Sequence, residues 1–340
     1  MKSTTWIYTN YKQGRKEIVS MNKLLTFLKQ WILVVALCVG SLVYLLFSEI
    51  PVLEPIGDFM GPKLVALLPY VIFLILYVTF CKIQVKELRP RTWHFILQGI
   101  RVALSAICVA LVAIAPSAGW KLIFEGMFIC FICPTAAAAP VITEKLGGSI
   151  ESMTVYILIA NCVTSVIIPL FFPMVEKSAD ISFLFAFLMV LKRVFIVLIV
   201  PLCLALLTRR YLPRVAQWIR DRRNLGFYLW SFNLSIIMGL AMQSILHAPV
   251  SGITLVALCV IPLFISVFQF GLGKFVGAHY GDSISAGQAL GQKNTVVGIW
   301  LTLAFLNPYA AIAPCAYVVW QNLINAVQLW VKEKYGALKW

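Results

Sequence analysis

Residues 284–306 read ISAGQALGQKNTVVGIWLTLAFL, an apolar stretch with a lysine near its middle. A stretch of this length is typical of a transmembrane helix, because about 20 apolar residues cross the hydrocarbon layer. Gly287, Gly291 and Gly298 interrupt its helical pattern. An ionisable side chain at this depth costs roughly 2.5–3.5 kcal/mol on insertion scales, so it is usually retained for an ion, a substrate or a proton pathway. Lys293 is therefore the first candidate for function.

The composition indicates a multi-pass membrane protein. Hydrophobic residues make up 61% of the chain and charged residues only 12%, which is far more apolar than a soluble domain. The formal net charge of +15 does not indicate a nucleic-acid partner, because the basic residues fall in short separated loops and not on one face with interleaved aromatics. Membrane lipid and a small molecule are the expected partners, and the oligomeric state is left open.

Apolar runs predict ten transmembrane helices. They cover residues 31–48, 64–81, 95–115, 122–142, 153–172, 190–207, 227–246, 253–271, 284–306 and 309–331.

The basic residues predict the orientation of these helices. Most Lys and Arg residues fall on one side if the N-terminus faces the cytoplasm, as the positive-inside rule requires. We therefore expect the cytoplasmic (inner) membrane, a cytoplasmic segment at residues 1–30 and a cytoplasmic tail at residues 332–340. The first 20 residues do not have the pattern of a cleaved secretory signal, and whether they precede a start at Met21 stays open.

The ten helices divide into two halves of five, residues 31–172 and 190–331. An odd number per half places the halves in opposite orientation, as in inverted-repeat transporters. The connection, residues 173–189, leads into either an interfacial helix or an early start of the sixth helix.

The fourth helix of each half is interrupted, at Pro134 and Pro140 in the first half and at the three glycines in the second. Broken helices at matching positions are typical of a binding site near the bilayer midplane, where unpaired backbone groups face the ligand. We therefore expect the two breaks to meet. The simpler interpretation is that Pro and Gly are common in membrane helices.

No metal site is expected. Cys130 and Cys133 form one C-x-x-C pair without a second pair or a nearby histidine, so we interpret them as core residues. His94, His247 and His279 lie at helix ends, without paired carboxylates.

Three short blocks resemble motifs of the bile acid:sodium symporter family. Residues 133–142, CPTAAAAPVI, resemble C-P-[ST]-G-T-A-S-N-V-[IM]; residues 289–295, ALGQKNT, resemble E-V-G-x-Q-N-S; and residues 319–323, VWQNL, resemble V-W-H-N-L. Their order and spacing extend the resemblance over residues 30–332. The resemblance implies a core domain (helices three to five and eight to ten) with two sodium ions beside the crossing of broken helices four and nine. It also implies a panel domain (helices one, two, six and seven) that moves against this core, and organic anions as substrates.

The chain departs from the family where the resemblance implies sodium ligands. The family's Ser-Asn pair falls on Ala139 and Pro140, its Glu on Ala289 and its Gln on Lys293, while serine and threonine ligands of the fifth helix fall on Met153 and Ile157. An alignment shifted by one residue places Gln288 at the glutamate position and restores one oxygen, but no carboxylate. Because a hard cation needs several oxygen ligands, we expect no sodium.

Lys293 offers a replacement for the ion. Its ammonium is a compact monovalent cation with three donors and can hold the helix crossing in place of sodium. A buried lysine also releases its proton more readily than an exposed one, so proton coupling is one mechanism, and facilitated or exchange transport is the other.

The polar residues of the two breaks, with two residues of neighbouring helices, form the candidate binding set. Arg101 is interpreted first as a residue that snorkels to the inner interface, with attraction of anions or replacement of a second sodium as the alternative. The full set is Lys293, Asn294, Thr295, Gln292, Gln288, Thr135, Pro140, Asn161 and Arg101.

The predicted function is alternating-access secondary transport of an organic anion that is bile acid-like, sulfated or a small carboxylate. The alternative is a non-transporting membrane sensor or interaction protein with a transporter fold, motivated by the missing sodium ligands. An enzyme is not expected, because the only ionisable residues expected at membrane depth are Arg101 and Lys293.

Overall fold

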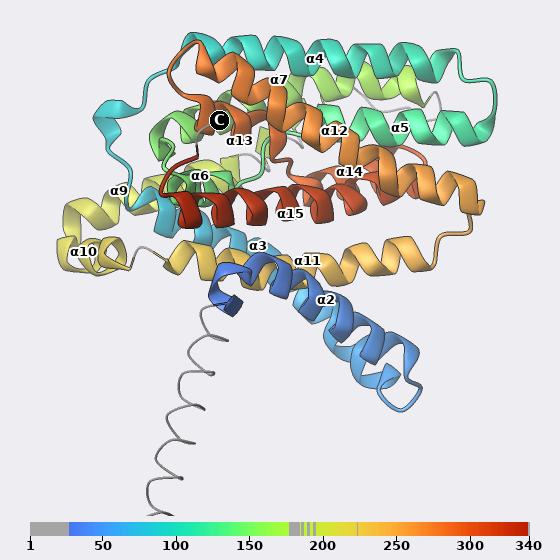
Figure 1. Ribbon diagram of the computed structural model, residues 1–340, viewed down its shortest axis with the longest axis horizontal. Helices are drawn as coiled ribbons and strands as arrows, with labels where there is room; N and C mark the ends of the chain where they lie inside the picture. Colours follow the sequence, from blue (N-terminus) through green and yellow to red (C-terminus); the bar gives the residue numbers. More distant parts are fainter. Residues whose placement is uncertain are drawn as a thin grey trace, which may run out of the picture.

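The computed structural model describes residues 27–176, 184, 187–188, 191–192, 195–222 and 224–338. The expectations for residues 1–26 and for most of the 177–194 connection fall on residues outside this description. The described part of the chain is helical and contains no strand (Figure 1). The helices are α2 (Ile32–Glu49), α3 (Glu54–Phe80), α4 (Thr92–Ala113), α5 (Ala118–Ile132), α6 (Ala139–Leu146), α7 (Ile150–Val175), α9 (Val200–Tyr211), α10 (Pro213–Asp221), α11 (Leu225–Leu246), α12 (Gly252–Ala278), α13 (Ser283–Gly291), α14 (Thr295–Phe305) and α15 (Ile312–Tyr335). The described structure also contains the 3-10 segments η1 (Val85–Glu87) and η3 (Pro308–Ala311), and a π-helical segment η2 (Phe195–Ile199).

Seven of the described helices are long and apolar enough to cross a membrane, or up to eight if the bent pair of α9 and α10 counts as one. The seven are α2, α3, α4, α7, α11, α12 and α15 with its preceding turn η3. The expected fourth and ninth spans are each divided into two short helices, α5 with α6 and α13 with α14. The protein is therefore an all-helical multi-pass membrane protein, and the count of ten spans stays a prediction.

Helix α3 begins before the apolar run from which the second span was predicted. We expected residues 64–81, but α3 begins at Glu54. Pro55 occupies the first turn, where a missing N–H removes no helical hydrogen bond, and Pro62 and Pro69 are accommodated within the helix. The polar residues before position 64 therefore extend this helix and do not form a loop.

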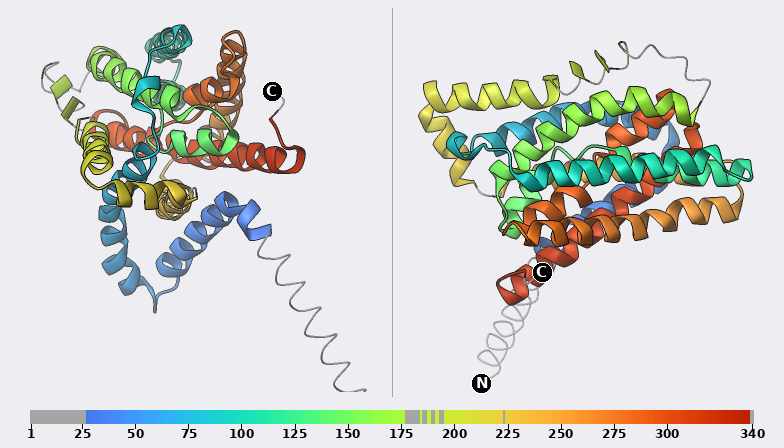
Figure 2. Two further views of the ribbon diagram at one scale, coloured as in Figure 1. Left: turned by 90° about the vertical axis from the view of Figure 1, so that its left-hand side faces the viewer. Right: turned by 90° about the horizontal axis from the view of Figure 1, so that it is seen from above.

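Helices α2 and α3 form a hairpin that projects from the rest of the bundle (Figure 2). Helix α11 packs against both of them and against α15, while α2 also contacts α15 and α3 also contacts α9. Many large apolar side chains on the outside of the bundle are exposed, such as Leu42, Phe59, Ile107 and Phe264. An outward apolar surface of this kind fits contact with lipid.

Helices α12 and α13 pack with their backbones in direct contact. A Cβ atom added at Gly273 would lie 2.4 Å from the carbonyl oxygen of Ala286, and one at Gly277 would lie 2.4 Å from the Ala286 Cβ. Only glycine permits this approach, and it positions α13, which leads into the second break.

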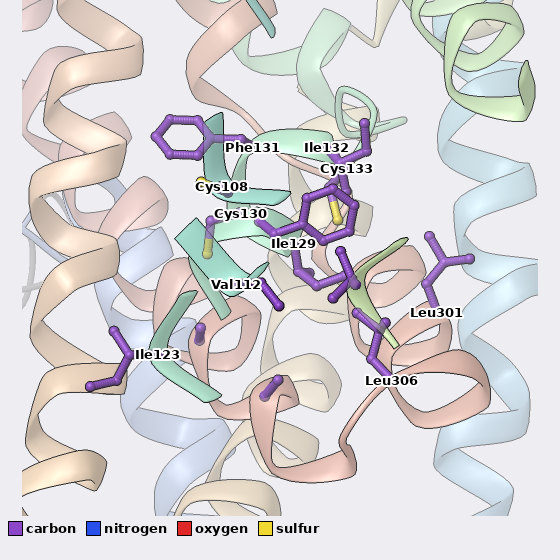
Figure 3. Packing of buried hydrophobic residues seen from close by; sticks show 14 of the residues in the cluster. Cys108, Val112, Ile123, Ile129, Cys130, Phe131, Ile132, Cys133, Leu301 and Leu306 are labelled. Carbon is purple, nitrogen blue, oxygen red and sulfur yellow. The ribbon is translucent and has the colours of Figure 1, made fainter. Parts of the chain in front are cut away.

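A buried apolar cluster surrounds the end of α5. Cys130, Phe131 and Ile132 from the last turn of α5 belong to the same cluster as Leu301 of α14 and Leu306 just after it, and Figure 3 shows these residues in one view. Helices α5 and α14, which belong to two different broken helices, therefore share one apolar core. This core holds the end of α5 in a defined place.

Candidate functional site

The two helix breaks meet. Thr135 and Lys293 form an isolated antiparallel bridge. The Ala136 N–H donates to the Gln292 carbonyl at 3.1 Å, and the Asn294 N–H donates to the Pro134 carbonyl at 2.8 Å. The expectation that the interrupted segments come together is confirmed.

Local sequence explains where the first break falls. Helix α5 ends at Ile132, and Cys133 is extended (φ −52°, ψ 135°) because a residue before proline is disfavoured in the helical region. The Thr135 hydroxyl then donates to the carbonyl of Ala289 at 2.6 Å. Thr135 therefore ties the first break to the end of α13.

Lys293 is held inside the crossing. Lys293 is only 2% exposed, and its Nζ atom donates to the carbonyl of Phe131 at 3.1 Å. The Gln321 side chain accepts from the Lys293 N–H at 2.8 Å and donates to the Lys293 carbonyl at 3.3 Å. The ammonium thus lies against the last turn of the opposing broken helix and away from lipid.

Arg101 does not snorkel, so that first interpretation is wrong. It is 1% exposed and donates to the carbonyl of Ile132 at 2.6 Å, the hydroxyl of Thr164 at 2.7 Å and the carbonyl of Ala160 at 3.1 Å. Its Nε also donates to Gln98 Oε1 at 2.9 Å. These four acceptors inside the bundle provide the hydrogen bonds that the guanidinium group would otherwise form with water at the interface.

Two cations cap the same helix end. The last carbonyls of a helix lack intrahelical partners and carry partial negative charge. At the end of α5, the carbonyls of Cys130, Phe131 and Ile132 accept from Gln269 Nε2, Lys293 Nζ and Arg101 Nη1 respectively. The positive charges therefore lie where the helix dipole is most favourable to them.

The other expected site residues are distributed over the crossing. Asn294 caps α14 by accepting from the Val297 N–H, and the Gln292 amide donates to Gln288, which donates to Gln328. Asn161 donates to the carbonyl of Ile157. Pro140 is buried in the first turn of α6, where it lines neither of the cavities described next.

A cavity of about 370 Å³ adjoins the crossing. Ligand pockets are commonly about 300–1,000 Å³ and mostly apolar with a few polar groups, and this cavity fits that pattern. Its polar lining comes from Thr135, Asn161, Thr164, Asn294 and Lys192, and its apolar lining from Leu68, Pro69, Ile72, Pro134, Ala137, Ile157, Ile196, Val197, Leu198, Val296, Val297 and Trp300. Thr164 was not among the predicted residues, since a single threonine in an apolar span carries no signal of its own.

A small hollow of about 20 Å³ lies on the α11 side of the crossing. Lys293, Asn294 and Thr295 line it together with Trp230 and Asn233 of α11. Ile72, Ala137, Asn294 and Val296 line both this hollow and the larger cavity. Thus the predicted residues Lys293, Asn294 and Thr295 share one hollow, whereas Thr135 and Asn161 line only the other cavity.

The expectation that Arg101 and Lys293 are the only deep ionisable residues is wrong. Glu125 of α5 is 1% exposed, and its Oε1 lies 3.6 Å from Lys121 Nζ. Lys121 also contacts Glu176 at 2.8 Å. The i, i+4 spacing of Lys121 and Glu125 is the sequence signal that identifies this pair.

Asp282 is also buried, and not solvated as its loop position suggests. It pairs with Arg91 at 2.9 Å and accepts from Ser152 at 3.1 Å, and His94 Nε2 lies 3.1 Å from the same serine hydroxyl. By contrast, Glu144 stays partly exposed in an ion pair with Lys82 at 2.9 Å. In the described part of the chain, no three His, Cys, Asp or Glu side chains come together as a metal site would require.

These features define the class of protein: a multi-pass helical membrane protein whose interrupted helices cross beside an internal cavity. The chain belongs to the sodium bile acid symporter family, whose model matches residues 69–248. Members of this family are transporters and not enzymes. A comparison with curated proteins finds no match.

Proposed function

We propose that this protein is a sodium-independent secondary transporter of an organic anion, with Lys293 in place of a sodium ion. The observation that carries the proposal is the contact of 3.1 Å between Lys293 Nζ and the Phe131 carbonyl at the helix crossing. Transport itself is supported by membership of the family and by the cavity beside the crossing.

Sodium independence is supported by the way in which the crossing uses its oxygens. A bound alkali cation needs several oxygen ligands in one shell. The carbonyls of Phe131 and Ile132 accept from cationic side chains, and the carbonyl of Ala289 accepts from Thr135. Ala289, where the family has a glutamate, adds no side-chain oxygen. The protein's own donors therefore occupy positions at which an ion would otherwise find ligands.

An anionic substrate is supported by the charges near the cavity. Lys192 lines the cavity itself, Lys293 lines the adjoining hollow, and Arg101 is bonded to Thr164, which lines the cavity. The remaining lining is apolar, which suits an organic body attached to a small anionic group. Bile acid-like, sulfated and small carboxylate compounds all have this form.

The proposed architecture is ten spans in two inverted repeats, with both termini in the cytoplasm and alternating access across the cytoplasmic membrane. The divided helices α5–α6 and α13–α14 would be the fourth and ninth spans, and α9 the sixth. Helices α2, α3, α9 and α11 would form the moving panel. The cavity is lined by α3 and η2 from one side and by α7 and α14 from the other, so a relative movement of these groups would open it.

The test is uptake into vesicles containing the purified full chain. The probes are benzoate, succinate, cholate and taurocholate, each measured in sodium, in potassium, and with an imposed pH gradient. We expect uptake of at least one anion at equal rates in sodium and potassium. A response to the pH gradient would indicate proton coupling, and no response would indicate facilitated or exchange transport.

Two outcomes contradict the proposal. Uptake that requires sodium would reject the role of Lys293 as its replacement. Saturable binding of a probe without any flux would favour a membrane sensor, which the replaced sodium-ligand positions make the second candidate.

A further inference from the structure

Two unpartnered polar side chains face the small hollow from α11. Trp230 is 6% exposed and Asn233 is 0% exposed, and both line the hollow. Within the described part of the chain, the indole N–H of Trp230 and both polar atoms of the Asn233 amide have no hydrogen-bond partner. Since buried polar groups are nearly always paired, unpaired ones indicate a partner that binds from outside the chain.

The rest of the lining of the hollow favours negative charge. It contains Ala138, which precedes the first turn of α6, and Thr295, which begins α14. The first N–H groups of a helix lack intrahelical acceptors and carry partial positive charge. The N–H groups of Ala139 and Thr295 donate to nearby carbonyls, so the two N-termini contribute partial positive charge and not free donors. Lys293 also lines the hollow and adds a full positive charge.

The dimensions fit the end of a larger ligand. The hollow of about 20 Å³ has room for one group the size of a water molecule or a carboxylate oxygen. It shares Ile72, Asn294 and Val296 with the cavity of about 370 Å³. A ligand whose apolar body lies in the cavity can therefore extend an oxygen past these side chains into the hollow.

We propose that the small hollow is a head-group subsite for a substrate carboxylate, with Trp230 Nε1 and Asn233 Nδ2 as its hydrogen-bond donors. This inference rests on the proposed transport of an organic anion and identifies the residues that select its charged end. The Asn233 oxygen is then left for a donor on the ligand or for a water beside it. Because Trp230 and Asn233 belong to α11 and Lys293 to the crossing, the bound carboxylate links these two parts of the molecule.

The experiment compares carboxylates with uncharged analogues in vesicles containing the full chain. Uptake of benzoate and cholate is measured against uptake of benzamide and the primary amide of cholate. The variants are Trp230→Phe, which keeps the ring and removes the N–H, and Asn233→Leu, which removes the amide. We expect each variant to raise the half-saturation concentration for the carboxylate about 10-fold or more, as the loss of one hydrogen bond to a charged group does, with little change for the amide.

Matched controls separate this role from a general effect of buried polar groups. Trp93→Phe also removes a buried unpartnered indole N–H, and Asn325→Leu removes an amide whose oxygen is buried and unpartnered, but neither residue lines the hollow. Both controls should keep the wild-type half-saturation concentration. Should Leu at position 233 prevent folding, Asn233→Ser provides the second variant.

The outcomes are distinguishable from those of the transport proposal. If the wild type takes up none of the anions, the transport function fails and this subsite with it. If the wild type transports a carboxylate and Trp230→Phe and the Asn233 variant keep the same half-saturation concentration, only the subsite is rejected. Unchanged uptake with a raised melting temperature for Asn233→Leu would show that the hollow holds no more than a water.

Discussion

At the scale of single residues, the two buried cations have different surroundings. Arg101 meets four acceptors from α4, α5 and α7, whereas among the described residues Lys293 Nζ has one acceptor, the carbonyl of Phe131. A side chain with many fixed partners contributes mainly to the stability of the fold. One with a single partner keeps donors available for a substrate or a proton, which fits Lys293 as the functional cation.

We predict that Lys293→Gln folds and loses transport. Glutamine retains an N–H donor on a side chain one bond shorter, but it carries no charge. The melting temperature of the purified protein should stay within a few degrees of the wild type, since neutral hydrogen bonds are worth only about 0.5–1.5 kcal/mol net. Anion uptake should fall at least about 10-fold, which corresponds to a loss of 1.4 kcal/mol. Lys86→Gln, an exposed lysine on η1, is the control, and normal uptake by Lys293→Gln would reject the assignment.

Replacement of Arg101 should damage the fold. Arg101→Met leaves the carbonyl of Ile132 and the Oε1 atom of Gln98 without the donor that they have in the native protein, and each unsatisfied buried group costs about 1–3 kcal/mol. The carbonyl of Ala160 keeps the hydroxyl of Thr164 as a donor. We expect a total loss of roughly 2–6 kcal/mol, the sum for two such groups. Thermal unfolding in detergent measures this loss. Arg214→Met on the exposed side of α10 should unfold like the wild type, and equal unfolding of the two variants would contradict the structural role of Arg101.

At the scale of elements, the contact between α12 and α13 sets the position of the second break. Gly273 leaves no room for a Cβ atom beside the Ala286 carbonyl. By contrast, a Cβ atom added at Gly271, two residues earlier on α12, would have no packing neighbour within 4 Å in the described part of the chain. Helix α12 thus contains both a residue for the test, Gly273, and a matched control, Gly271.

We predict that Gly273→Ala separates α12 from α13 and weakens both folding and transport. The added methyl group would have to displace backbone, and overpacking of this kind costs about 1–3 kcal/mol. Gly271→Ala should be neutral or slightly stabilising, because alanine favours a helix by up to about 1 kcal/mol relative to glycine. Melting temperature and uptake, measured for both variants, test the prediction; a neutral Gly273→Ala would show that the two helices can move apart without cost.

At the scale of the whole molecule, alternating access requires α11 to move against the crossing. Gly226 of α11 lies opposite α6, with an added Cβ atom only 3.4 Å from Val141 Cγ2. Gly119 of α5 lies opposite α12 at the same distance, 3.4 Å from Thr254 Oγ1. In the proposed architecture the first pair joins panel to core, and the second lies within the core.

We predict that a disulfide between Gly226→Cys and Val141→Cys arrests uptake and that a reductant restores it. The separation is compatible with disulfide geometry. A disulfide between Gly119→Cys and Thr254→Cys should leave uptake unchanged, because it joins two helices that move together. Both pairs require a background without the native free cysteines that still transports. Full uptake by the oxidised variant with Gly226→Cys and Val141→Cys would exclude movement of α11 against α6.

Much of the fold was predictable because it depends on patterns within short segments. Pro134 predicts the end of α5, and the glycines near Lys293 predict the second interruption, since both act through local backbone geometry. Apolar length alone did not indicate that α3 begins at Glu54, where Pro55 lies in the first turn and Pro62 is accommodated within the helix. The meeting of the two breaks was predictable from their matching positions in the two halves.

The partners of the site were less predictable, since they come from distant segments. Arg101 and Thr164 are separated by 63 residues, and Lys293 and Phe131 by 162. Snorkelling was the reasonable expectation for an arginine near a helix end, and only the acceptors of α5 and α7 overturn it. Likewise, Asn233 was not a candidate, because a polar residue in an apolar helix does not reveal which neighbour it faces.

By itself, the sequence determined that this chain is a helical membrane protein with two interrupted helices, and that a lysine stands at the second interruption. Apolar length, proline and glycine act locally, so these conclusions need no knowledge of what lies nearby. The tertiary structure alone decided that Lys293 and Arg101 cap the same helix end, that Glu125 and Asp282 are buried, and that α11 turns two unpaired side chains toward the crossing. Burial and pairing are properties of packed neighbours, and the packing of distant helices is what places those neighbours.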